Sequence, residues 1–125
     1  MEKTAQFFIT YEQLFITSGV LINRLMSEVE NKIDAEKMGK IAKVLKVISH
    51  PVRLEVIELL LAKGELSVGV IKDTLDIEQS LLSHHLTKMR QRGVLASSRQ
   101  GKHIFYSVAI SEIATIFNCM RHCNL

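Results

Sequence analysis

Two amphipathic segments separated by a very short turn place the strongest constraint on the fold of this 125-residue chain. The first, residues 67–75, begins with Ser67, a residue type that favours the N-cap of a helix. The second spans residues 78–92, and Asp76 suits the turn between them because aspartate tolerates a left-handed backbone. Two helices joined so closely predict a helix-turn-helix, whose second helix enters the major groove of DNA.

The second segment has one apolar face and one polar face. Leu82, Leu86 and Met89 stack on one side at helical spacing and are expected to face a core. The other side holds small polar side chains, which can approach base edges closely, although an ordinary solvated face is the alternative. The side chains expected to read bases are Gln79, Ser80, Ser83 and His84, with Thr87 on the same face and Lys88 placed for a phosphate.

The residues after this helix predict a β-hairpin. Ile104, Tyr106 and Val108 alternate as strand residues do, and Gly101 stands where a tight hairpin needs a positive φ. The hairpin tip would carry two cations, Arg99 and Lys102, in position for phosphates or a minor groove.

Positive charge is concentrated in this same part of the chain. Residues 79–111 contain five Lys or Arg and no Asp or Glu, whereas the whole chain has a formal charge of only +3. A domain that gathers its positive charge in one continuous segment is typical of polyanion-binding proteins. Double-stranded DNA is therefore the expected partner.

Five segments follow one another in an order known from a family of DNA-binding proteins. They are Ser49-His50-Pro51-Val52-Arg53-Leu54, Ser67-Val68-Gly69 through Ile77, Gln79-Ser80-Leu81-Leu82-Ser83-His84-His85-Leu86, Gly93-Val94-Leu95, and Gly101-Lys102 to Tyr106-Ser107. This order, over residues 35–108, resembles the ArsR family of bacterial winged-helix repressors. The resemblance implies a homodimer paired through its terminal helices. In many members of that family, a metal or thiol-reactive effector releases the DNA.

The chain departs from the family pattern at two positions near the turn. Asp76 stands where glycine is common, and Glu78 stands where a serine cap is common. The turn is expected to survive because aspartate tolerates a left-handed backbone. The carboxylate of Glu78 is expected to repel phosphate and to narrow the preferred DNA sequences.

The predicted fold class is mainly α with a small β-hairpin wing, a winged helix-turn-helix that is dimeric through its N- and C-terminal helices. Residues 1–34 are expected to form an apolar dimerisation helix, 35–109 the DNA-binding core, and 110–125 a C-terminal helix at the dimer contact. Polar residues interrupt the first region, so neither a signal peptide nor a membrane anchor is predicted. Its apolar seam, which could instead pack on its own domain, consists of Phe8, Tyr11, Phe15, Ser18, Ile22, Leu25 and Val29.

Three further helices are expected around the helix-turn-helix. One spans residues 35–48, and its core face would be Met38, Ile41, Leu45 and Ile48. Its other face, expected to be solvated but with contact to the DNA backbone as the alternative, would be Lys37, Lys40, Lys43 and Lys46. Pro51 suits the first turn of the next helix, which is apolar nearly all round and ends at Gly64. Ser111 would cap the last helix, whose buried stripe would be Ile113, Ile116, Phe117 and Met120.

The end of the chain holds the only two cysteines, Cys119 and Cys123, with His122 beside them. Two cysteines without a signal peptide indicate a reducing compartment, and hence a cytoplasmic protein without disulfides. Thiolates and imidazole are soft ligands that suit a soft metal ion such as Zn(II), Cd(II) or As(III). Metal binding, reversible thiol oxidation and a purely structural role all remain open for these three residues.

The predicted function is a sequence-specific DNA-binding transcriptional regulator, a repressor that binds an inverted-repeat operator as a homodimer. A winged-helix protein-interaction module is the alternative, as is a repressor that responds through Cys119 and Cys123. No enzyme is predicted, because no oxyanion donor or orienting acid accompanies the thiols. His50 and His85 are expected to be helix-entry and packed residues, and Arg53 a surface or cap residue.

Overall fold

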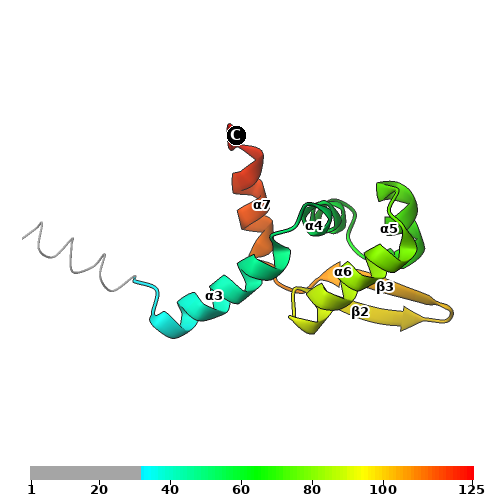
Figure 1. The fold of residues 1–125 in the computed structure, drawn as a ribbon, viewed down its shortest axis with the longest axis horizontal. Helices are drawn as coiled ribbons and strands as arrows, with labels where there is room; N and C mark the ends of the chain where they lie inside the picture. The colour runs from blue at the N-terminus through cyan, green and yellow to red at the C-terminus, as the bar shows by residue number, and fades with distance from the viewer. Residues whose placement is uncertain (1–31) are drawn as a thin grey trace, which may run out of the picture. The chain divides into compact units, whose positions relative to one another are not determined.

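The computed structural model of the protein describes residues 32–125, so the aromatic seam predicted before residue 30 lies outside the described residues. Residues Gly39–Leu125 form one compact unit. The described elements in chain order are α3 (Ala35–Ile48), α4 (Pro51–Lys63), β1 (Leu66–Ser67), α5 (Val68–Leu75), α6 (Gln79–Gln91), β2 (Leu95–Gln100), β3 (His103–Val108) and α7 (Ile113–Arg121) (Figure 1).

Helix α4 supplies the centre of the core, and its ends form as the sequence predicts. Pro51 occupies the first turn, and the Nδ1 atom of His50 caps the helix by accepting the N–H of Val52 at 3.2 Å. Gly64 ends the helix with a φ of 82°, a backbone conformation that favours glycine. The fully buried residues of α4 are Val56, Ile57 and Leu60.

The helix-turn-helix consists of α5 and α6. The Ser67 hydroxyl accepts the N–H of Val70 at 3.3 Å, which confirms the predicted N-cap of α5. Asp76 ends α5 in the left-handed region with a φ of 50°, so aspartate makes the turn that the family usually makes with glycine. Helix α6 buries Leu82, Leu86 and Met89 completely, as its apolar face predicts.

The wing is a two-residue hairpin with a third strand beside it. Gln100 pairs with His103, so Gly101 and Lys102 form the loop, and Gly101 has the expected positive φ of 63°. Strand β1 extends the sheet to the order β1-β3-β2 by pairing Leu66 with Tyr106. Strand β1 was not predicted from the sequence, because two residues are too few to show alternation.

The predicted core face of the first described helix is only partly correct. Ile48, in the last turn of α3, is buried, but Met38 and Leu45 are 51% and 43% exposed. Periodicity identifies an apolar face but not its partner. Of the four residues on this face, only Ile48 at its C-terminal end is buried by the described residues.

Two expectations for α7 are also corrected. Ser111 does not cap the helix: Glu112 occupies the N-cap position, without a side-chain cap bond, and the Ser111 hydroxyl donates to the Glu112 carboxylate at 3.1 Å. Ile113 and Phe117 are buried as predicted. The other half of the predicted buried stripe, Ile116 and Met120, is 37% and 43% exposed.

Long-range polar contacts join α7 and the wing to the region around α4. Arg121 donates two hydrogen bonds to Glu58, the shorter at 2.9 Å, which ties the end of α7 to α4. The hydroxyl of Ser98 on β2 donates to the carboxylate of Glu65 at 2.6 Å.

Within residues 32–125, no helix is long and apolar enough to span a membrane.

Candidate nucleic-acid interface

The N-terminus of α6 is capped by the residue that departs from the family pattern. The Glu78 carboxylate accepts the N–H of Ser80 at 3.0 Å and the N–H of Leu81 at 2.9 Å, and it also accepts the Ser80 hydroxyl. These hydrogen bonds, those from Ser80 foremost, lower the pKa of Glu78 below its ordinary value. The carboxylate therefore stays ionised at the helix N-terminus, where the helix dipole also favours it.

This cap determines what the Ser80 hydroxyl can recognise. An ionised carboxylate only accepts hydrogen bonds, so the hydroxyl proton of Ser80 must point to Glu78. The hydroxyl then presents its free lone pairs outward, as an acceptor. In the major groove such an acceptor matches the amino groups of adenine or cytosine.

The polar face of α6 is available to a ligand. Thr87, which was predicted to lie on the same face, is half-buried, so its hydroxyl is less accessible to a ligand. The exposed members of the predicted set are Gln79, Ser80, Ser83, His84 and Lys88 on α6, together with Arg99 and Lys102 on the wing.

A groove of about 340 Å³ brings part of this set together. Gln79 and Ser83 line it from α6, and Lys102 lines it from the wing tip. Ser67 and Gly69, at the start of α5, line the same groove. Helix and wing therefore present polar and cationic side chains side by side, although Gln79 and Lys102 are 23 positions apart in the sequence.

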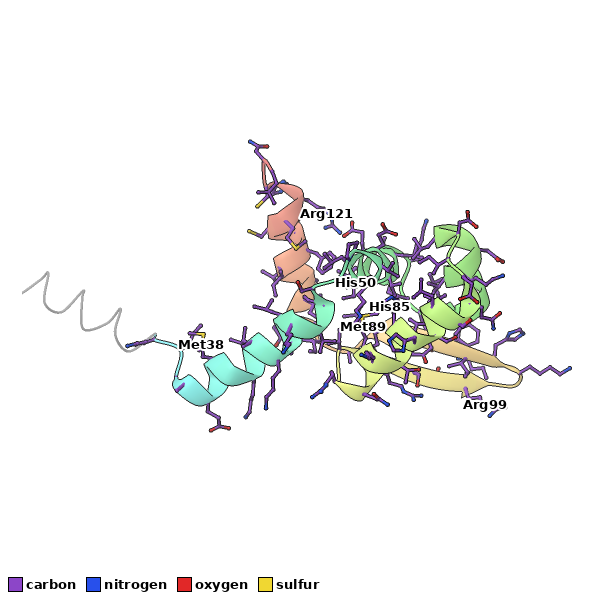
Figure 2. All side chains as sticks on the ribbon, in the orientation of Figure 1. Met38, His50, His85, Met89, Arg99 and Arg121 are labelled. Atoms are coloured by element: carbon purple, nitrogen blue, oxygen red, sulfur yellow. The ribbon has the colours of Figure 1, made fainter. Side chains whose placement is uncertain are left out.

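Arg99 is placed differently from Lys102. It projects from β2 near the tip of the wing, and its Nε donates to the main-chain oxygen of Gly101 at 3.4 Å (Figure 2). Its guanidinium is exposed and lies outside the groove. A phosphate contact beside the groove suits this position better than a base contact.

Behind the polar face, α6 is fastened to α4 by an arginine for which the sequence predicted no such role. Arg53 Nε donates to Nδ1 of His85 at 3.0 Å, and Arg53 Nη1 donates to the main-chain oxygen of Val47 at 2.6 Å. One side chain thus joins α3, α4 and α6. The only signal for this role in the sequence was a cation near the start of a mainly apolar helix. The sequence could not identify the partner of this cation, because the partner is 32 residues away.

His85 is kept neutral by its surroundings. Burial is the largest cause that lowers its pKa, and electrostatic interactions with neighbouring basic side chains lower the pKa further. Those neighbours are His50, His84, Arg53 and Lys88. The ring centroid of His50 lies 4.5 Å from that of His85 (Figure 2), and the ring centroid of His84 lies 5.7 Å from it. Since Nδ1 accepts from Arg53, the proton of the neutral ring is on Nε2.

The two cysteines lie at the C-terminal end of the chain. Cys119 lies on α7, and Cys123 follows His122, which ends that helix; both thiols are free and exposed. Residues 32–125 contain no group of three His, Cys, Asp or Glu side chains that could hold a metal ion.

The fold and this surface define a winged helix-turn-helix protein. A family model described as a helix-turn-helix domain matches residues 48–97, which cover α4 to the middle of the wing.

Named repressors and solved structures are similar over most of the chain. The biofilm growth-associated repressor of Xylella fastidiosa is 32% identical over 104 residues, covering 80% of this chain and 90% of that protein. The transcriptional repressor PagR of Bacillus anthracis is 39% identical over 92 residues, 74% of this chain and 92% of PagR. The PagR crystal structure has a TM-score of 0.65 and covers 70% of this chain and 99% of that one. The structure of HlyU from Vibrio cholerae is 27% identical in sequence, has a TM-score of 0.65, and covers 70% of this chain and 95% of that one.

The chain belongs to the ArsR family of winged-helix transcriptional repressors.

Proposed function

We propose that the protein is a transcriptional repressor that binds an inverted-repeat operator in double-stranded DNA as a homodimer. The observation that carries the proposal is the groove in which Gln79 and Ser83 of α6 face Lys102 of the wing. The residues of α6 and of the wing that line this groove belong to the acid-free segment of residues 79–111, and no residue that lines the groove is acidic. The names of the relatives, two of which are repressors, support the same function.

Each half of the dimer would place α6 in a major groove. Ser80 accepts from a base amino group, while Gln79, Ser83 and His84 supply the other base contacts. The cations position the protein on the backbone without reading sequence. They are Lys88, Arg99 and Lys102.

The homodimer is supported by apolar side chains that the described residues cover only in part. Leu45 on α3 and Ile116 and Met120 on α7 are exposed. In this proposal residues 110–125 contact the partner subunit, residues 1–34 add a second dimer contact, and residues 35–109 hold the DNA. The two α6 helices then reach successive major grooves, about one helical turn or a multiple of it apart.

The test is binding of the purified full chain to a labelled fragment from its own upstream region, with random DNA as competitor. We expect Ser83→Ala/His84→Ala to lose discrimination between the two DNAs while its circular dichroism spectrum stays unchanged. The control, Ser49→Ala, removes an exposed serine hydroxyl outside this face and outside the proposed dimer contacts, and it should bind as the wild type does. Unchanged discrimination in the first variant would refute the reading face, and absence of binding by the wild type would favour a protein-interaction module.

A further inference from the structure

A second hollow lies near the C-terminal end of α6 and is lined by residues from the ends of α3 and α6 and from the start of α4. Its volume is about 380 Å³, within the range of small-ligand sites. Five cations and one amide line it: Lys43, Lys46, Arg53, Lys88, Arg92 and Gln91.

The positive charge of this hollow is not neutralised within the described part of the chain. The hollow has no acidic lining residue. None of the five cations forms an ion pair with a described residue, whereas Lys72 and Arg121 elsewhere do so with Asp73 and Glu58. Like charges at this density repel one another unless an anion lies between them.

Arg53 makes the hollow a built site rather than a group of mobile lysines. Its guanidinium is half-buried and held from two sides, by Val47 O at 2.6 Å and by His85 Nδ1 at 3.0 Å. Both partners are neutral acceptors, so a partly desolvated cation lacks a counter-charge among residues 32–125. A buried charge is expected to have such a partner.

We propose that this hollow binds a phosphate group, with Arg53 at its base and the lysines and Arg92 around it. Guanidinium and ammonium groups are the usual ligands of phosphate oxygens. Lys88 and Gln91 also border the polar face of α6, since His84, Lys88 and Gln91 follow one another at helical spacing. The phosphate is therefore either a backbone phosphate of DNA bound to that face or a small free phosphate compound.

The first arm of the experiment needs no DNA. Inorganic pyrophosphate is titrated into the full-length protein, and backbone amide shifts are followed by NMR. We expect saturable shifts around residues 43–47, 53 and 88–92, and at least tenfold weaker binding by Lys43→Gln/Lys46→Gln. Lys37→Gln/Lys63→Gln removes the same charge from exposed positions outside the hollow and should bind as the wild type does.

The second arm rests on the proposed DNA binding and measures how affinity falls with salt. Each phosphate contacted contributes a slope of about −0.9 in log affinity against log salt. If DNA supplies the phosphate, the slope for Lys43→Gln/Lys46→Gln should be less negative than the slope for the control variant. The difference should correspond to the loss of about one or two phosphate contacts.

The two arms separate the two sources. Saturable pyrophosphate binding that depends on the hollow, with an unchanged slope, identifies a free phosphate ligand. A reduced slope without pyrophosphate binding identifies a DNA phosphate. Equal behaviour of both variants in both arms would overturn the proposal. It would leave the repressor proposal intact, because that depends on discrimination by Ser83 and His84.

Discussion

Arg53 Nε donates a hydrogen bond to the buried Nδ1 of His85, which stands 32 positions further along the chain. Since His85 belongs to the helix that carries the proposed base-reading residues, this bond controls how α6 lies on α4. It also makes the position of α6 depend on the protonation state of one imidazole.

The first prediction concerns pH. The pKa of His85 is lowered from its ordinary 6.5 in the folded protein, so the unfolded chain binds this proton more readily. The free energy of unfolding is therefore expected to fall as the pH drops from about 7.5 through 6.5 and below. Urea unfolding at a series of pH values measures this dependence.

Two variants assign the pH effect to one residue. His85→Asn retains an acceptor for Arg53 but cannot be protonated, so its stability should depend less on pH in this range. His103→Asn changes an exposed histidine of the wing and should keep the wild-type dependence. Equal pH dependence of both variants and the wild type would contradict the role of His85.

The second prediction tests the fastening of α6. Arg53→Ala leaves the oxygen of Val47 and Nδ1 of His85 without their donor, and we expect a loss of about 2–3 kcal/mol in the free energy of unfolding. Arg90→Ala removes an exposed arginine of α6 and should change stability by less than about 0.5 kcal/mol. Urea unfolding measures both, and similar small effects would show that the two hydrogen bonds contribute little.

The third prediction concerns the cap at Glu78. Glu78→Ala removes the acceptor for the N–H groups of Ser80 and Leu81, so the melting temperature should fall. DNA affinity at low salt should nevertheless rise, because a negative charge next to the phosphates is lost. Glu78→Ser restores a cap without the charge and should recover stability while keeping the higher affinity. A lower affinity in both variants would indicate that the carboxylate itself helps to order the reading face.

The fourth prediction tests the proposed dimer. Met120→Glu places a charge on the exposed apolar side of α7, next to Ile116, and should shift the protein from dimer to monomer in sedimentation velocity experiments. Val70→Glu changes an equally exposed apolar residue on α5 and should leave the sedimentation coefficient unchanged. A dimer that survives the first change would move the interface away from this part of α7.

Much of the site was readable from the sequence because its parts are local. The cap at Ser67, the left-handed Asp76 and the hairpin at Gly101 each depend on a few consecutive residues, and all three occur as predicted. The two faces of α6 were readable because helical spacing alone separates its polar, exposed residues from its buried apolar ones. The sign of the partner's charge followed from the absence of acids in residues 79–111.

The incorrect predictions share one physical cause. A periodic pattern in the sequence identifies an apolar face or a strand, but it does not identify the distant residues that pack against it. The same periodicity that correctly buries Ile48 and Phe117 also marked Leu45 and Met120, which the described residues leave exposed. Strand β1 exists only because Leu66 meets Tyr106, 40 positions later.

The amino-acid sequence by itself determined the winged helix-turn-helix, its reading helix and its preference for a polyanion, since caps, turns and periodicities act over a few residues. Only the tertiary structure decided that Arg53 joins α3, α4 and α6, that Gln79 and Ser83 share a groove with Lys102, and that cations from three helices surround one hollow. These arrangements depend on which side chains meet across the core, and that outcome belongs to the packing of the whole domain.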